Sequence, residues 1–217
     1  MSTVLEQIDW DAMILSIQET LFMTFFSLLI AVVLGFGLGI ILYVTKDDGL
    51  YPNKIINRIL DFIVNLRRAV PIIILLPVTI FLVGTMLGAK AALPALIISS
   101  APFYARMCMI ALSEVDKGTI EASKAMGASH LQIITKVLIP EAKPALISSI
   151  TVMGISLVGY TAMAGCIGAG GLGNVAYMYG YARQNMVVMY TATFFVLVIV
   201  FIIQGIGDYV VKRIDKR

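Results

Sequence analysis

Long uncharged runs dominate the pattern of hydrophobic and polar positions along this chain of 217 residues. A helix rises about 1.5 Å per residue, so about 20 apolar residues cross a hydrocarbon core of roughly 30 Å. Several runs exceed that length, and one of them is interrupted only by Arg106. The pattern predicts membrane-spanning helices at about residues 14–45, 68–88, 91–113, 144–166 and 187–208.

Composition supports the same class of protein. Hydrophobic residues make up 59% of the chain and charged residues 13%, whereas soluble domains carry about a quarter charged residues. A soluble fold would leave most of the apolar runs unburied. We therefore expect an all-α integral membrane protein with five transmembrane helices.

Positive charges indicate the orientation of these helices. An odd number of crossings places the chain ends on opposite sides, and Lys and Arg accumulate on the cytoplasmic side. With the N-terminus outside, all but two of the 16 Lys and Arg residues, Lys90 and Arg183, are cytoplasmic. The expected organisation is an external segment 1–13, a membrane domain 14–208 and a basic cytoplasmic tail 209–217.

The elbow loop, about residues 114–143, is the longest predicted cytoplasmic loop. Thr119 is a candidate N-cap for a helix over residues 120–126, in which Glu121 complements the helix dipole. Gly127 suits the left-handed position that ends a helix. The loop therefore begins with a short, well-capped helix.

A second helix follows in the elbow loop. Ser129 and Gln132 match the capping-box pattern at its start, and Pro140 is expected to end it. One apolar face is predicted from Leu131, Ile134, Val137 and Leu138. The residues alone leave two uses open: a surface helix on lipid headgroups, or a docking arm for a second cytoplasmic protein.

The spacing of the loop resembles the EAA loop of ABC-importer permeases: Glu-Ala-Ala, three residues, Gly, nine residues, then Ile-x-Leu-Pro. The matching positions are Glu121, Ala122, Ser123, Gly127 and Val137-Leu138-Ile139-Pro140. The departures at Ser123, Val137 and Ile139 are conservative. Residues 101–107, 120–129 and 157–181 are in addition similar to the permeases of methionine importers.

The resemblance implies the type I permease fold of ABC importers, with the elbow loop as coupling helix. It also implies a homodimer in the bacterial plasma membrane, two copies of a cytoplasmic ATPase subunit and an extracytoplasmic methionine-binding lipoprotein. The implied function is import of L- and D-methionine or close derivatives by alternating access. ATP hydrolysis then belongs to the partner, so this chain is no enzyme.

Residue by residue, the resemblance assigns two sites. The elbow residues Glu121, Ala122, Ser123 and Gly127, together with Pro140, are implied to couple the permease to the ATPase. Met163 is implied to form the translocation gate at the dimer axis, with Tyr160 as its neighbour on the same helix face.

Three alternatives remain open at this point. The chain could be a permease for another amino acid, a secondary transporter driven by an ion gradient, or an assembly protein that uses the loop only for docking. A secondary transporter usually carries buried carboxylates or internal repeats. No Asp or Glu lies deep in a predicted span, which weighs against that class.

The remaining motifs say less about function. Residues 168–173 match GxGxxG literally, but follow a membrane span on the external side, where we expect a re-entrant or flexible loop instead of a nucleotide site. His130, the single histidine, is predicted to be solvated. Cys108 and Cys166 are predicted to be packing residues, so the sequence indicates no metal site. We expect no cofactor and no nucleic-acid partner. Arg106 is expected to snorkel or to pair with a cytoplasmic carboxylate.

Overall fold

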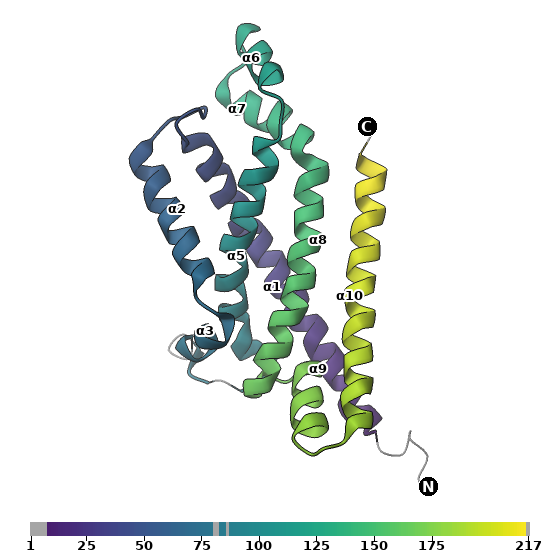
Figure 1. Ribbon diagram of the computed structural model, residues 1–217. Helices are drawn as coiled ribbons and strands as arrows, with labels where there is room; N and C mark the ends of the chain where they lie inside the picture. Colours follow the sequence, from purple (N-terminus) through teal and green to yellow (C-terminus); the bar gives the residue numbers. More distant parts are fainter. Residues whose placement is uncertain (1–7, 80–82, 86, 216–217) are drawn as a thin grey trace.

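The computed structural model describes residues 8–79, 83–85 and 87–215, and this described part is helical without a strand (Figure 1). The long helices are α1 (Trp10–Thr45), α5 (Ala89–Ser113), α8 (Ile139–Ala164) and α10 (Met186–Ile214). The shorter helices are α2 (Lys54–Ala69), α3 (Ile72–Val78), α6 (Lys117–Ala125), α7 (His130–Ile133) and α9 (Gly171–Asn174). Three π-helical segments are η2 (Ile134–Leu138), η3 (Gly165–Ala169) and η4 (Val175–Tyr181).

Among the described residues, four helical stretches are long and apolar enough to cross a membrane: α1, α5, the stretch His130–Ala169 and α10. They correspond to the first, third, fourth and fifth predicted spans, which confirms an all-helical membrane fold. The start of α1 and the end of α10 lie at opposite ends of the molecule (Figure 1). An odd number of crossings requires this arrangement.

The second predicted span, residues 68–88, is not one helix, and its predicted start is wrong. α2 begins at Lys54 and ends at Ala69, Val70 takes an extended conformation, and α3 follows Pro71. The proline ring pushes the preceding residue out of the α region, which explains the break. Figure 1 shows α2 leading from the end that carries α6 toward α3 at the other end, so two helical pieces make this crossing. Residues 80–82 and 86 of the predicted span lie outside the described part.

The prediction that Pro140 ends a helix is also wrong. Pro140 lies in the first turn of α8, and the helix is continuous from His130 through η2 to Ala164. Proline lacks the N–H that would bond to the carbonyl group four residues earlier. The π-helical segment η2 directly precedes this turn, and its wider spacing accommodates the proline without breaking the helix.

α1 and α5 pack through small residues. A methyl group at Gly35 of α1 would lie 2.6 Å from the carbonyl oxygen of Ala101, and one at Gly39 would lie 2.6 Å from Cβ of Cys108. The missing side chains let the two backbones approach closely, which is the usual basis of helix association in a bilayer. Cys108 is fully buried in this contact, as expected of a packing residue.

α8 packs on α5 at the centre of the molecule. Tyr104 of α5 is buried in one apolar cluster with Met153 and Leu157 of α8. α10 joins this core from one side only, where Gly207 leaves room for Thr151 of α8. Its remaining surface and that of α1 expose large apolar side chains that suit lipid, among them Phe25, Leu29, Phe194 and Phe201.

The glycine contact gives a first prediction. Gly35→Ala should lower the free energy of unfolding by about 1–3 kcal/mol, because the added methyl group overlaps the Ala101 backbone. Gly37→Ala is the matched control, since no atom lies within 4 Å of that position. It should change stability by no more than about 1 kcal/mol, in the stabilising direction. Thermal unfolding in detergent measures both, and equal midpoints for the two variants would contradict the packing.

Candidate functional site

The first helix of the elbow loop begins after Asp116 and not after Thr119, so the predicted cap is wrong. The Asp116 carboxylate accepts a hydrogen bond from the backbone N–H of Thr119 at 3.0 Å, and α6 covers Lys117–Ala125. The end of the helix is as predicted: Gly127 has φ +81°, and its N–H donates to the carbonyl oxygen of Lys124 at 2.9 Å. Gly127 therefore makes the sharp turn between the two helices.

The second helix of the elbow loop has the predicted start. The Ser129 N–H donates to the Gln132 side-chain oxygen at 2.8 Å, and the Gln132 N–H donates to the Ser129 hydroxyl at 3.3 Å. Its apolar face is only partly as predicted. Ile133 and Leu138 are buried, whereas Leu131 is 67% exposed.

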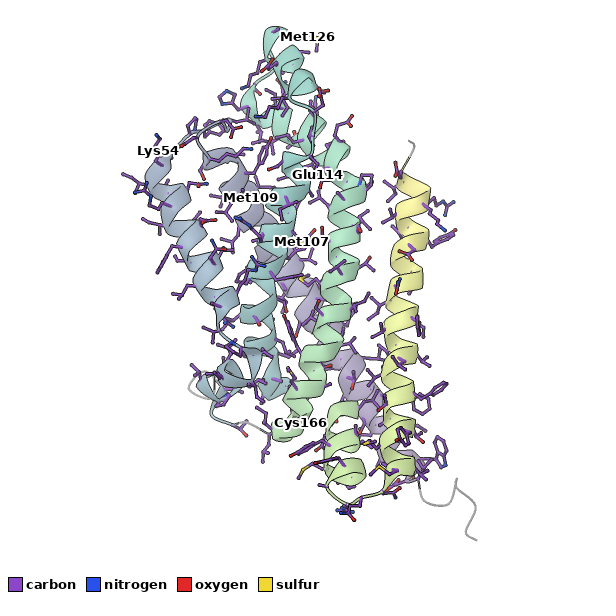
Figure 2. The ribbon with its side chains drawn as sticks, viewed as in Figure 1. Lys54, Met107, Met109, Glu114, Met126 and Cys166 are labelled. Carbon is purple, nitrogen blue, oxygen red and sulfur yellow. The ribbon has the colours of Figure 1, made fainter. Side chains whose placement is uncertain are left out.

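The turn presents an unpartnered surface at the tip of the molecule. Glu121, Ala122 and Gly127 are exposed, and apart from its chain neighbours no described residue comes within 4 Å of the position of a Cβ at Gly127. Met126 is 81% exposed and lies at the far end of the molecule in Figure 2. Its position directly before a left-handed glycine is the sequence signal for this exposure, because its side chain leaves the end of the helix.

Two predicted coupling residues lie outside this tip surface. Ser123 is buried, and its hydroxyl donates to the carbonyl oxygen of Thr119 at 2.8 Å. Pro140 is exposed, but it lies in the first turn of α8. The structure therefore gathers Glu121, Ala122 and Gly127 into one surface and separates the other two from it.

Contacts with the loop after α1 hold the elbow loop in place. The Lys117 ammonium donates to the Asp48 carboxylate at 2.9 Å, and this hydrogen bond lowers the pKa of the Asp48 carboxyl. The His130 ring is half-buried and lies edge-on to the Tyr51 ring with centroids 4.6 Å apart, so the prediction of a solvated histidine is wrong. The loop is thus supported from α1 as well as by its own caps.

Arg106, the charged residue inside α5, pairs with Asp61 of α2. Its Nη1 atom lies 2.9 Å from Asp61 Oδ1, and both side chains are partly exposed. The expected pairing with a carboxylate is confirmed. The carboxylate belongs to α2, which begins before the predicted second span.

The predicted gate residues line one cleft. Tyr160 and Met163, one turn apart in α8, border a space of about 440 Å³ between α8, α5 and the break from α2 to α3. Met163 is 46% exposed. We call this space the gate cleft, and its other walls include Arg68, Ile72, Ile73, Ser99 and Phe103. Sequence analysis singled out none of these other walls, among which Arg68 is the charged residue.

The gate cleft and the elbow loop lie at different ends of one continuous helix. That helix begins at His130 and passes Met163, and its backbone leaves the helical conformation at Ile167 and Gly168. Figure 2 shows Met126 and Cys166, three residues after Met163, at opposite ends of the molecule. The arrangement connects a surface at the tip directly to the residues of the cleft.

The glycine-rich segment 165–173 is a tight reversal packed on α1, not a flexible loop. The Glu19 carboxylate accepts a hydrogen bond from the Gly171 N–H at 2.6 Å. A Cβ at Gly170 would collide with Glu19, and a Cβ at Gly173 would collide with the backbone of Ala162. The GxGxxG pattern therefore serves close backbone packing.

Comparison with known proteins relates this architecture to transport. The model of the family described as "binding-protein-dependent transport system inner membrane component" matches residues 35–216. The methionine import system permease protein of Bacillus subtilis (strain 168) is 58% identical over 181 residues, 82% of each chain. A probable D-methionine transport system permease protein of Vibrio cholerae serotype O1 is 44% identical over 211 residues, 95% of this chain and 94% of the relative.

Solved structures have the same fold. A chain of the MetNI methionine ABC transporter in an inward-facing conformation superimposes with a TM-score of 0.92 and 43% identity, covering 100% of both chains. A chain of an amino acid ABC transporter with histidines matches with a TM-score of 0.81 at 18% identity, covering 98% of this chain and 99% of the other. The second likeness concerns the fold alone.

The ion pair between α5 and α2 gives a second prediction. Asp61→Asn leaves Arg106 without its counter-charge inside the membrane and should lower the free energy of unfolding by about 1–3 kcal/mol. The asparagine oxygen can still accept from Asn65, which donates to Asp61 at 2.9 Å, so this variant tests the charge. The double variant Asp61→Asn/Arg106→Gln should recover part of the loss. Strictly additive losses would show that the two side chains do not interact.

Proposed function

The chain belongs to the family of binding-protein-dependent transport system inner membrane components, and from this premise we propose that it is the permease subunit of an ATP-driven methionine importer. The substrate is carried over from the close relatives that are named as methionine permeases. The observation that carries the proposal is the exposed turn at Gly127, joined by one helix to the gate cleft. These names favour methionine over another amino acid.

The tip of the elbow loop is the surface that docks into a cytoplasmic ATPase subunit. Glu121 offers a carboxylate to a basic partner, and Ala122 and Gly127 let another backbone approach closely. Met126 and Leu131 add apolar side chains that a partner can bury. Ser123 supports the turn from inside, and η2 lets the helix continue past Pro140 toward the membrane.

The helix His130–Ala169 transmits the motion of the ATPase. Its 33 steps from His130 to Met163 correspond to about 50 Å of helix. Closure of two ATPase subunits on ATP would move the docked elbow loops, and the connected helices would then move the gate residues Met163 and Tyr160. This chain provides the moving helices and the path for the substrate, while the ATPase hydrolyses ATP.

The complete transporter contains two copies of this chain, two ATPase subunits and an extracytoplasmic methionine-binding protein. A single chain leaves the gate cleft open on one side, and a second copy would close it. The N-terminus lies outside. The positive charges support this orientation: eight of the 16 Lys and Arg residues belong to the elbow loop, to the segment from the end of α1 to the start of α2, or to the last turn of α10, namely Lys46, Lys54, Lys117, Lys124, Lys136, Lys143, Lys212 and Arg213.

Uptake into proteoliposomes tests the function directly. Vesicles that contain this chain and its ATPase should accumulate labelled L- and D-methionine when ATP is inside and the loaded binding protein outside. Collapse of the proton and sodium gradients should leave the rate unchanged. Uptake that follows an ion gradient and ignores ATP would instead identify a secondary transporter.

The docking assignment gives a third prediction. Gly127→Trp should reduce ATP-driven uptake at least tenfold, because the indole ring fills the space that the ATPase backbone needs, while membrane insertion stays normal. Gly37→Trp is the matched control, since that glycine faces open space on α1. Transport at the wild-type rate by Gly127→Trp would exclude this docking surface.

A further inference from the structure

We propose that Arg68 binds the carboxylate of the amino acid as it passes through the gate cleft; this assignment rests on the function proposed above. Arg68 is the only charged residue among those that line the cleft, and it forms no ion pair within the described part of the chain. Arg68 reaches the cleft because α2 starts at Lys54. Fourteen residues of helix place Arg68 about 20 Å from that start, in the last turn of α2 and beside the break that borders the cleft.

An arginine inside a membrane is costly and usually faces a cavity or a partner. Arg106 has its partner in Asp61. The Arg67 guanidinium is buried in a different groove between α1, α2 and α5, without a hydrogen-bond partner in the described residues. Of these three arginines only Arg68 opens into the space that also contains Met163 and Tyr160. Its position indicates a ligand and not a structural partner.

The chemistry of the cleft fits a zwitterionic amino acid with an apolar side chain. The planar guanidinium of Arg68 matches a carboxylate with two parallel hydrogen bonds. The hydroxyl groups of Ser99 and Tyr160 can accept from the ammonium group, and Phe103 and Ile73 offer apolar surface to a thioether side chain. The volume of about 440 Å³ lies in the usual range for small-molecule sites.

One charged contact in an open cleft also suits the demands of transport. A site on a translocation path must attract its substrate and then release it. A single arginine gives a carboxylate one strong partner and leaves the rest of the molecule weakly held. The same positive charge would favour amino acids with a free carboxylate over those whose carboxylate is blocked.

The test uses the whole transporter in proteoliposomes, with saturating methionine-loaded binding protein. Arg68→Gln should reduce the maximal rate of methionine uptake at least tenfold, and Arg68→Lys, which keeps the charge, should retain more uptake. ATP hydrolysis stimulated by the loaded binding protein should stay within twofold of wild type, because the docking surfaces are intact. Arg67→Gln is the matched control and should transport at the wild-type rate, since its side chain lies outside the cleft.

Each outcome of this experiment either supports or overturns the carboxylate site. Wild-type uptake by Arg68→Gln, an equal loss in Arg67→Gln, or a parallel loss of ATP hydrolysis would overturn the carboxylate site. In those cases the proposed function is still supported if the wild-type transporter imports methionine. Absence of ATP-driven methionine import by the wild-type transporter would overturn the proposed function itself.

Discussion

The close approach of α1 and α5 is the contact on which the rest of the architecture depends. Lipid tails are as apolar as the helix surfaces, so helices in a bilayer associate through close packing instead of hydrophobic burial. Gly35 and Gly39 remove side chains where α1 meets the backbone of α5 at Ala101 and Ala105. With α5 fixed in this way, α2 can reach Arg106 through Asp61, and α8 can pack on Tyr104. The gate cleft is the space left between these partners.

The continuous helix from the elbow loop to the gate cleft explains how one chain can serve both ends. A helix broken at Pro140 would act as a hinge and would lose motion between the tip and the membrane. The π-helical segment η2 instead absorbs the proline, and the salt bridge of Lys117 with Asp48 ties the loop to the end of α1. In the proposed mechanism, movement of the tip is passed along α8.

Local chemistry predicts much of this structure. Four crossings follow from uncharged runs, the turn at Gly127 from the ability of glycine to adopt a positive φ, and the start of α7 from the capping-box spacing of Ser129 and Gln132. Each depends on residues close together in the chain. The family resemblance then identifies Met163 and Tyr160, which the structure brings into one cleft.

The structural features that the sequence did not predict depend on contacts between residues far apart in the chain. The break before Pro71 shifts the second crossing toward Lys54, and this shift moves Arg68 from an expected cytoplasmic flank into the cleft. Leu131 leaves the predicted apolar face because η2 changes the helical register and Ile133 is buried in its place. Glu19 holds Gly171 across 152 residues of sequence, a contact that no local pattern could reveal.

The most direct test of a permease that works through a docked ATPase is to purify the tagged chain from its native membranes in mild detergent and to identify what accompanies it. We expect an ATP-binding subunit in a one-to-one ratio with this chain. A variant with an altered turn at Gly127 should no longer carry that subunit. Recovery of the chain alone in repeated mild preparations would contradict the account, because the exposed tip at Met126 would then have no partner.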